Sequence, residues 1–311
     1  MQLLNRLSQQ FREIINHEVR KAFGSPELEK RLRGYSTFEM QWHQLWRENI
    51  ECTTSGISSE RYGNAEVIVS LTSYGHRLNE VALTIESIMQ GTIKPNRIIL
   101  WLQDDYEGKV LPSSLIRQQK RGLEICYCPD WRSYKKLIPT LQKYPDACIV
   151  TIDDDVIYYP NMLENLVRGW QEDPQYIYAN RVFEIPEPTG GYCAYNKKVV
   201  AARESVSPRN IFTGVGGVLY PPHSLDPEVL NVEMIRQLAP ETDDIWFHAM
   251  ALKKGTLVKK VYTHHENGED YLLNEMVQMD GLWTVIIEGN EPQFKAVFDH
   301  YGLWTKLLNS K

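Results

Sequence analysis

The residues best suited to chemistry in this chain are three consecutive aspartates, Asp153, Asp154 and Asp155. They directly follow the apolar run 147–152, whose β-branched residues and flanking turns predict a buried strand. Adjacent like charges repel, and carboxylate oxygens are hard ligands that suit Mg²⁺ or Mn²⁺. Ligands of open α/β sheets also bind beyond the carboxyl ends of the strands. An acidic turn before the helix that follows Pro160 would account for one aspartate, but the triplet favours a metal site.

A second acidic pair lies at the predicted start of a later helix. Thr242 is a good N-cap, and Asp243 and Asp244 would then occupy the first turn, where the helix dipole favours negative charge. That structural role accounts well for one acid. The second acid, close to Trp246, indicates a general base placed over an acceptor hydroxyl.

The loop 72–77, which joins the first predicted strand to a helix, suits a nucleotide. Its hydroxyls and arginine offer donors and charge to phosphate, and its tyrosine offers a stacking surface to a base. It is neither a GxGxxG loop nor a Walker loop, which disfavours hydride-transfer and P-loop enzymes. Taken alone, an ordinary β–α turn explains it equally well. The candidate donor-binding residues of this loop are Thr72, Ser73, Tyr74 and Arg77.

Charged residues at two further turns are candidates for the same ligand. Asp104, at the end of the second predicted strand, would accept from a base imide or a ribose hydroxyl, although an exposed acidic turn explains it at least as well. Lys135 and Lys136 open a helix, where positive charge opposes the dipole unless an anion lies nearby. A solvated basic face is the alternative for either lysine.

A glycine-rich segment, 213–222, and a histidine pair complete the candidates. Three glycines in four residues let a backbone approach a ligand closely, or simply form a tight turn into a strand. In the first case the following tyrosine would wall a substrate pocket. The histidines follow a predicted strand, where one imidazole would complete the metal shell or have a structural role. These candidates are Gly214, Gly216, Gly217 and Tyr220 for substrate, together with Trp246 beside the second acidic pair, and His264 or His265 for the metal.

The elements that must position these residues alternate between strand and helix. The predicted strands are 67–71, 97–102, 123–128 and 147–152, and the predicted helices are 78–90, 113–121, 134–143 and 161–170. This order predicts an α/β fold with a mostly parallel sheet covered by helices on both faces. The second half is less regular, and its long loops are typical of binding elements. Its predicted strands are 176–179, 217–220 and 257–261.

Residues 1–50 are predicted to form a helical extension. Apolar residues recur at spacings of three and four between residues 3 and 19, with basic residues between them. Ser25 as N-cap and Pro26 at the first helical position then start a second helix. A basic amphipathic helix can lie on an anionic membrane, but packing on its own domain or on a second subunit is the commoner role. The segment 52–64 reads as a linker.

Composition limits the partners and the compartment. The chain has 311 residues, a net charge of −6 and a sequence pI near 5.8, which argues against a nucleic-acid-binding protein. Its five cysteines are scattered and odd in number, so no structural disulfide is expected. No stretch approaches the roughly 20 apolar residues of a membrane span, and the N-terminus lacks the layout of a secretory signal. We therefore predict a cytoplasmic protein, with peripheral contact to the inner membrane face through residues 1–24 as an option.

In this order, the candidate segments resemble the GT-A fold of metal-dependent glycosyltransferases that use nucleotide sugars, specifically the inverting group of the bacterial surface-polysaccharide type. Residues 153–155 are similar to the DxD motif of that group, and 242–244 to its ED-type acidic motif. The resemblance covers about residues 65–290. Two departures concern the second strand, which ends in Gln-Asp-Asp at 103–105 where Asp-Gly-Ser is common, and the acidic motif, which reads Asp-Asp where Glu-Asp is common.

The resemblance implies a function and a division of the chain. It implies transfer of a sugar, with inversion, from a nucleotide diphosphate donor (UDP favoured) to a glycan or lipid-linked glycan, as in polysaccharide, lipopolysaccharide or capsule synthesis. The alternatives are a nucleotidyltransferase acting on sugar phosphates, or an inactive carbohydrate-binding or scaffold protein. The implied organisation is an extension and linker at 1–60 and a GT-A domain at 61–311, with a nucleotide-binding half at 65–160 and an acceptor-binding half at 161–290.

The resemblance also implies roles for the acids. Asp244 matches the catalytic base of that group, although Asp243 is the neighbouring candidate. Asp155, with Asp153 and His265, would hold Mn²⁺ or Mg²⁺, and Asp153 and Asp154 would contact the donor. Because alternate residues of an extended segment share a face, Asp153 and Asp155 are expected to act together and Asp154 to tolerate substitution best.

Overall fold

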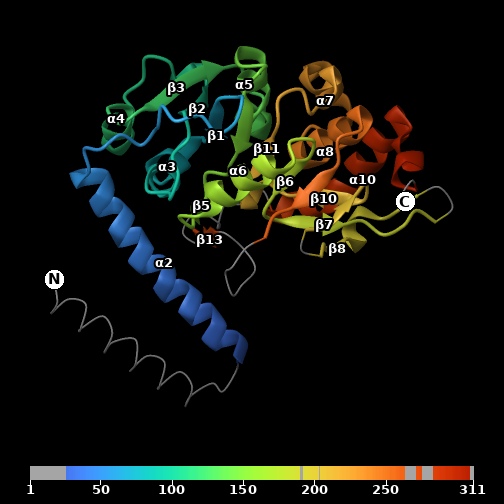
Figure 1. The fold of residues 1–311 in the computed structure, drawn as a ribbon, viewed down its shortest axis with the longest axis horizontal. Coiled ribbons are helices and arrows are strands. Elements are labelled where there is room, and N and C mark those ends of the chain that lie inside the picture. The colour runs from blue at the N-terminus through green and yellow to red at the C-terminus, as the bar shows by residue number, and fades with distance from the viewer. Residues whose placement is uncertain (1–25, 190–191, 203, 263–270, 275–282, 309–311) are drawn as a thin grey trace.

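A central eight-stranded sheet organises the computed structural model of the chain, which describes residues 26–189, 192–202, 204–262, 271–274 and 283–308 (Figure 1). Its strands are β1 Val67–Thr72, β2 Arg97–Gln103, β3 Leu123–Cys128, β4 Cys148–Thr151, β6 Ile177–Ala179, β9 Val206–Ser207, β11 Val218–Tyr220 and β12 Val258–Lys260. They lie in the order β3-β2-β1-β4-β11-β6-β12-β9. The first four run parallel and β12 is parallel to β6, whereas β11 and β9 are antiparallel to their neighbours. The predicted α/β fold with a mostly parallel sheet is confirmed.

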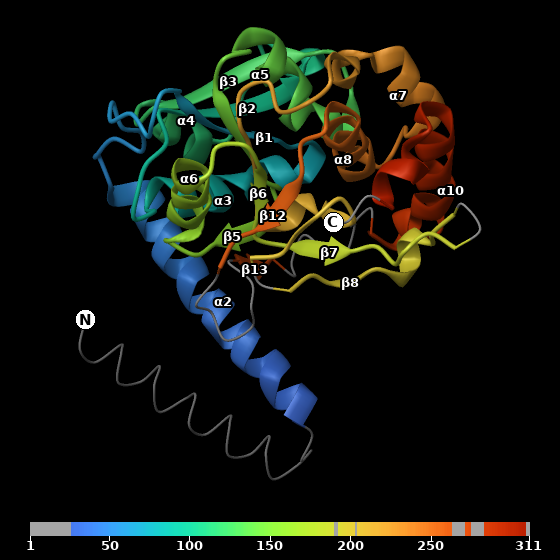
Figure 2. The ribbon, with the colours of Figure 1, turned by 45° about the vertical axis from the view of Figure 1, so that its right-hand side comes forward.

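Helices cover both faces of the sheet, because alternate side chains of its strands are buried on opposite sides. The helices are α3 Val81–Met89, α4 Ser113–Gln119, α5 Ile138–Lys143, α6 Met162–Glu172, α7 Val232–Leu238, α8 Asp243–Lys254 and α10 Trp283–Tyr301. Val67, Val69 and Leu71 of β1 pack in a cluster with α3, α4 and α6. Ile68, between them, belongs to a second cluster with α5, α8 and α10. Figure 2 shows α3 and α6 on one side of the sheet and α8 and α10 on the other.

The helical extension is confirmed where the structure describes it. Helix α2, Pro26–Glu51, extends away from the sheet as a long rod (Figure 1). Phe38, at the middle of the helix, and Leu45, nearer its C-terminal end, are buried against Leu83 of α3 and Ile157. Residues 1–24 and Ser25, on which the membrane option and the N-cap rest, lie outside the described residues. Across the described ranges, no helix is both long enough and apolar enough to cross a membrane.

Two small sheets were not predicted. One joins β10 Asn210–Phe212, β7 Val182–Glu184 and β8 Val199–Val200, and the other pairs β13 Tyr271–Leu273 with β5 Val156–Tyr158. Each of these strands has only two or three residues, too few for a period of two to show in the sequence. Both sheets lie next to the candidate residues in the chain. Strand β5 directly follows the three aspartates, and β10, in the three-stranded sheet, directly precedes the glycine-rich segment.

Two predicted helices are each split by a 3₁₀ turn. The predicted helix 78–90 is the turn η1 Gly75–Asn79 followed by α3, and the predicted helix 134–143 is η3 Arg132–Lys136 followed by α5. Pro139, in the first turn of α5, has no amide hydrogen to give to a preceding turn, so a new helix starts there. The two 3₁₀ turns carry the basic side chains Arg77 and Lys136 to the carboxyl edge of the sheet.

Candidate functional site

The candidate site lies at the carboxyl edge of the sheet, beside the neighbouring strands β1 and β4. These parallel strands end at Thr72 and Thr151, and the aspartate triplet follows the second of them. From β1, the chain order runs to β2 and β3 on one side and to β4 on the other. The site therefore lies at a switch point of the sheet, where open α/β proteins bind ligands.

Asp154 is a buried structural acid, which contradicts the expectation that it tolerates substitution best. It is 7% exposed, and its carboxylate accepts hydrogen bonds from the Ser73 hydroxyl at 2.5 Å and from Nη1 of Arg77 at 2.9 Å. Arg77 is itself buried and also lies 3.4 Å from a carboxylate oxygen of Asp155. The expectation failed because Asp154 and Asp155 form a turn and not an extended segment, so alternation does not apply.

Asp155 is less completely compensated than Asp154. Its pKa is raised to about 6 by burial and by the charges of Asp153 and Asp154, while Arg77 opposes that shift. Its backbone carbonyl accepts from the Asn274 amide at 3.0 Å, which fastens the turn to the segment after β13. A cation near this carboxylate would stabilise its charged form.

Lys136 links the triplet to the second acidic pair. Its ammonium lies 2.7 Å from Oδ1 of Asp153 and 2.9 Å from Oδ2 of Asp243, and its side chain is only 6% exposed. Burial disfavours the charge of Lys136, but the aspartates outweigh it and hold its pKa well above the usual range. The structure thus brings together two acidic motifs that are 90 residues apart in the sequence, with a buried cation between them.

Asp244 is held by the glycine-rich segment. Both of its carboxylate oxygens accept from the backbone amide of Gly214 at 3.0 Å. Unlike Asp243, which is buried and paired with Lys136, Asp244 is partly exposed. Its pKa is raised to about 7 by burial and the charges of Asp243 and Asp153, against the opposing effects of Lys136 and the Gly214 amide. Asp244 can therefore accept a proton near neutral pH.

A side chain at Gly214 would crowd the charged groups of the site. A Cβ atom there would lie 2.6 Å from Nζ of Lys136, 3.1 Å from Oδ1 of Asp244 and 3.3 Å from Oδ1 of Asp153. It belongs to the 3₁₀ turn η5, Gly214–Gly216. The close backbone approach that the glycines predicted is present here, although toward the acidic side chains of the protein itself.

The other two glycines shape the turn into β11. A Cβ on Gly216 would lie 3.0 Å from the backbone nitrogen of Arg181. Gly217 has φ +85°, a conformation that favours glycine. Tyr158 of β5 ties this turn to the triplet, because its hydroxyl accepts from the Asp153 amide at 3.0 Å and donates to the Val215 carbonyl at 2.9 Å. Sequence reasoning missed Tyr158, whose only signal was its place in the apolar segment after the triplet.

Tyr220 and Trp246 were predicted to contact substrate, but within the described residues neither side chain lines a pocket. Both are buried in the core, with exposed fractions of 2% and 0%. The Trp246 indole donates to the Val229 carbonyl at 3.1 Å, and the Tyr220 ring packs edge-on against Phe247. They stabilise the face of the sheet on which α8 packs.

The remaining predicted residues lie around this centre in different environments. Thr72 donates to the Trp101 carbonyl, and Tyr74 is 45% exposed with its ring over the Arg77 guanidinium. Asp104 is exposed in the turn η2, Asp104–Tyr106. Lys135 points away from the acids and pairs with Asp130 at 2.5 Å.

Two expectations about α8 have separate outcomes. The helix begins at Asp243 as predicted, with both acids in its first turn. Thr242 precedes it but makes no side-chain cap, because its hydroxyl donates to the Gln293 side chain instead. The two acidic side chains of this turn are held by Lys136 and by the Gly214 amide.

The predicted metal ligands are two aspartates and one histidine of the pair 264–265. No group of three or more histidine, cysteine, aspartate or glutamate side chains is arranged to hold a metal ion within the described ranges. His264 and His265 lie outside those ranges. Asp153 and Asp155, both partly exposed, are two oxygen donors on one turn. This number suits a Mg²⁺-type ion, which takes one or two carboxylates and completes its shell with water and substrate phosphates.

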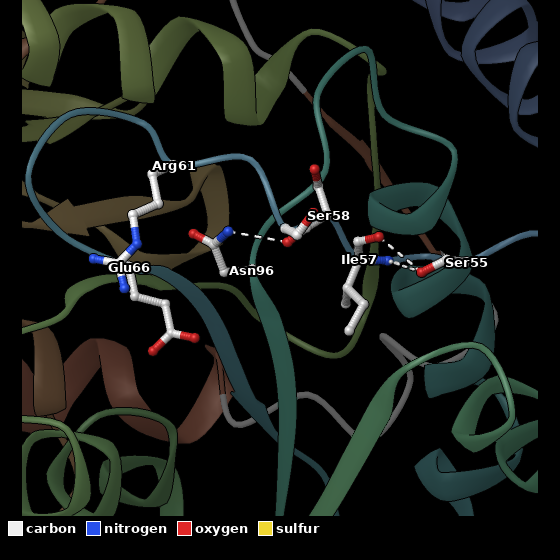
Figure 3. Close-up of a pocket in the computed structure, with 7 residues that line it drawn as sticks. Ser55, Ile57, Ser58, Arg61, Glu66 and Asn96 are labelled. Carbon is white, nitrogen blue, oxygen red and sulfur yellow. Dashed lines mark hydrogen bonds between the residues drawn. The ribbon is translucent and has the colours of Figure 1, made fainter.

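A separate cavity of about 610 Å³ opens near the amino ends of β1 and β2 (Figure 3). The Asn96 amide projects into it but is fully engaged, donating to the Ser58 and Glu60 carbonyls and accepting from the Val67 amide. Glu66, on its wall, is paired with Arg97. The Asn96 contacts therefore hold the linker on the sheet.

No protein-family model and no curated protein matches the chain. Among solved structures, a CMP:2-keto-3-deoxy-manno-octonic acid synthetase in complex with CTP aligns at 10% identity over 72% of this chain and 99% of that one, with a TM-score of 0.38. A mannosyltransferase from Pyrobaculum calidifontis in complex with GDP-Man and Mn²⁺ aligns at 14% identity over 72% and 62%, with a TM-score of 0.39. An inositol-1-phosphate CTP transferase from T. maritima aligns at 10% identity over 80% and 98%, with a TM-score of 0.42. Because all three TM-scores are below 0.5, none of these likenesses assigns a fold family or an activity to this chain.

Proposed function

We propose that this protein is a GT-A-type glycosyltransferase that moves a sugar, with inversion, from a nucleotide diphosphate donor to a hydroxyl of a glycan acceptor. The observation that carries the proposal is the pairing of two acidic motifs across Lys136. One motif, at the switch point of the sheet, suits a diphosphate and its cation, and the other presents Asp244 as a base. The resemblance of these motifs to the DxD and ED-type motifs of inverting enzymes favours the same function.

The geometry favours Asp244 over Asp243 as the base. Asp243 is 8% exposed and its carboxylate is paired with the ammonium of Lys136, so it is already engaged and poorly accessible to an acceptor hydroxyl. Asp244 is partly exposed, is oriented by the Gly214 amide, and has a pKa of about 7. A base is most effective when its pKa is near the working pH.

In the proposed reaction, the acceptor oxygen attacks the anomeric carbon and its proton passes to the Asp244 carboxylate. The bond between that carbon and the diphosphate oxygen breaks, and the nucleoside diphosphate leaves from the opposite face. A single displacement of this kind inverts the anomeric configuration. The amide of Gly214 keeps the Asp244 carboxylate in place. The ammonium of Lys136 lies between the carboxylates of Asp153 and Asp243 and reduces the repulsion between them.

Asp153 and Asp155 are the residues that would hold Mn²⁺ or Mg²⁺, with His265 as a third candidate. A divalent cation bound there would neutralise charge on the leaving diphosphate. Arg77 and Ser73 act indirectly, since they hold Asp154 and thereby fix the turn that carries both ligands. Among the candidate donor-binding residues, Tyr74 and Asp104 remain available to a nucleoside at the same edge of the sheet, and UDP is our preferred nucleotide.

The experiment is a screen of UDP-, GDP- and CDP-sugars with Mn²⁺, in which release of nucleoside diphosphate is measured for the wild type, Asp244→Asn and Asp243→Asn. A parallel assay of the wild type measures pyrophosphate formed from a nucleoside triphosphate and a sugar phosphate. We expect one donor to release its nucleoside diphosphate slowly, with water as acceptor. Asp244→Asn should lower that rate about 10²- to 10⁴-fold, while the thermal shift caused by the donor persists. Asp243→Asn keeps Asp244, and its rate of donor hydrolysis should therefore fall less than that of Asp244→Asn.

Three results would count against the proposal. A wild-type rate in Asp244→Asn would remove the assigned base. Formation of pyrophosphate from a nucleoside triphosphate and a sugar phosphate would instead indicate nucleotidyl transfer, and the absence of a thermal shift with every nucleotide would favour a binding or scaffold protein.

A further inference from the structure

The hydroxyl of Tyr158 joins the aspartate turn (residues 153–155) to the 3₁₀ turn η5. Tyr158 is the last residue of β5 and is 2% exposed. Its hydroxyl accepts from the Asp153 amide at 3.0 Å and donates to the Val215 carbonyl at 2.9 Å. An amide can only donate and a carbonyl can only accept, so the hydroxyl uses its proton on one turn and a lone pair on the other. Replacing Tyr158 by Phe would remove both bonds at once.

The two turns carry different parts of the proposed site. Asp153, in the aspartate turn, is a candidate ligand of the cation on the diphosphate. The first residue of η5, Gly214, orients Asp244 through its amide. The ammonium of Lys136 joins side chains of the two acidic motifs, whereas the hydroxyl of Tyr158 joins the backbones of the two turns. The phenol therefore links the group that would hold the donor to the group that would take the proton.

The other end of Tyr158 is fixed to helix α3 and to strand β13. Its backbone amide donates to Oγ of Ser87 at 3.1 Å, and that hydroxyl donates to the Thr84 carbonyl at 2.6 Å. Strand β13 pairs with β5 and places Tyr271 opposite Tyr158. A side chain that is held both at its backbone and at its tip has little freedom to move. The phenol can therefore set the spacing between the two turns.

Each turn also has a support that does not involve the phenol. Oγ of Thr84 in α3 donates to the Asp154 carbonyl at 3.2 Å, which holds the aspartate turn on that helix. The side-chain amide of Asn180, directly after β6, donates to the Gly216 carbonyl at 2.8 Å, which holds η5 on the sheet. Loss of the Tyr158 hydroxyl would leave both supports in place and would weaken the connection between the turns.

We propose that Tyr158 is a positioning residue whose hydroxyl sets the spacing between the aspartate turn and the turn that orients Asp244. This inference rests on the proposed transferase function, because it takes Asp244 as the base and the aspartate turn as the holder of the donor. Attack requires the acceptor oxygen to lie about 3–3.5 Å from the anomeric carbon, and a misplacement of about 1 Å costs about a hundredfold in rate. A donor held on a loosened turn would still bind but would seldom reach that geometry.

The test compares Tyr158→Phe with Tyr178→Phe in the full chain. Tyr178 is the matched control, because it is also buried and its hydroxyl also donates to a backbone carbonyl, that of Asp173 at 2.7 Å. Each change removes a single oxygen atom. Steady-state kinetics of donor hydrolysis, recorded well below the Tm of every variant, give kcat and KM. The change Tyr158→Phe is also made in the Asp244→Asn variant, which completes a double-mutant cycle.

We expect Tyr158→Phe to lower kcat about a hundredfold and to leave the KM for donor nearly unchanged, because donor binding needs the aspartate turn alone. Tyr178→Phe should keep the kcat of the wild type. In the Asp244→Asn variant, Tyr158→Phe should have little further effect, because no base is left to position. A general loss of structure would instead lower the rate by the same factor in both backgrounds.

Amide hydrogen exchange tests the link between the turns without any turnover. The amide of Gly214 bonds to Asp244 and not to Tyr158. Tyr158→Phe should nonetheless speed exchange in the peptide that contains Gly214 about tenfold, the factor for one lost hydrogen bond. Tyr178→Phe should leave exchange in that peptide at the rate of the wild type.

Three results would overturn the inference. Tyr158→Phe keeps the kcat of Tyr178→Phe, or it lowers kcat by the same factor with and without Asp244, or exchange around Gly214 stays at the rate of the wild type. Failure of the proposed function is recognised separately, because the wild type would then hydrolyse no nucleotide sugar. The exchange measurement would still decide whether the Tyr158 hydroxyl holds the two turns together.

Discussion

Replacing Lys136 by Met removes the cation that links the two acidic motifs while keeping most of the volume of the side chain. In the native structure its ammonium contacts Asp153 at 2.7 Å and Asp243 at 2.9 Å. The change leaves both carboxylates without that partner. The adjacent Lys135→Met is the matched control, because Lys135 pairs with Asp130, whose side chain is 49% exposed.

The expected magnitudes differ because the partners differ in burial. Removing one member of a buried ion pair costs about 3–5 kcal/mol, since the remaining charge stays buried without a partner. Asp243 is 11% exposed and Asp153 is 29% exposed as side chains, so the lower end of that range applies to Lys136→Met. Lys135→Met should cost about 0–1 kcal/mol, because water solvates Asp130 once the pair is lost. For a chain of this size the first change lowers Tm by about 5 °C.

The assay is urea unfolding of the wild type and both variants at pH 8 and pH 5. The ammonium of Lys136, with its raised pKa, is charged at both values, so its contribution to the wild type is present throughout. In Lys136→Met both carboxylates lose this cation at either pH, so the variant should be less stable than Lys135→Met at both values. Equal free energies of unfolding for Lys136→Met and Lys135→Met at either pH would refute this account.

Three further changes test other parts of the structure. Gly214→Ala should lower donor hydrolysis about a hundredfold, because the new Cβ would lie 2.6 Å from the Lys136 ammonium; unchanged rates would show that the turn relaxes freely. His248→Leu should make stability less sensitive to acid, because burial lowers the pKa of His248 to about 3. Through this group the wild type is fully stabilised above pH 6.5 and loses about 2 kcal/mol of its free energy of unfolding by pH 5. The same dependence of urea stability on pH in wild type and variant would refute this. Asp154→Asn should lower Tm more than Asp155→Asn, because Asp154 is the more deeply buried acid and accepts two side-chain hydrogen bonds; the reverse order in a thermal melt would contradict its structural role.

Strands and helices with a long, regular apolar pattern were predicted well, and short strands that depend on distant partners were not. The strands of the first half carry continuous apolar runs that burial on both faces of a sheet requires, so β1, β2, β3 and β4 were found close to their observed bounds. The strand pairs around β5 and β7 are two or three residues long and depend on partners far along the chain. No local pattern predicts such pairing.

The misplaced site residues follow the same physical rule. Tyr220 and Trp246 are amphipathic aromatics, which pack in a core or line a pocket depending on what covers them, and here the sheet and α8 bury both. Asp154 was expected to tolerate substitution best among the three aspartates. That expectation was wrong because the contacts of Asp154 with Ser73 and Arg77, which are more than 70 residues away in the sequence, are tertiary. The roles of Thr72, Tyr74, Asp104 and the histidine pair as ligand-binding residues stay predictions, as does the division of the chain at residue 160.

The sequence by itself determined the mostly parallel α/β sheet and the placement of an acidic triplet at the end of β4, because strand burial and strand order are written in local apolar patterns. It also placed two acids at the start of α8. Only the tertiary structure decided which acid is buried and which is available. Lys136 forms ion pairs with Asp243 and Asp153, and Arg77 forms one with Asp154. The Gly214 amide orients Asp244, whose pKa is raised to about 7. Desolvation and charge pairing depend on groups that are distant along the chain, and folding alone brings those groups together.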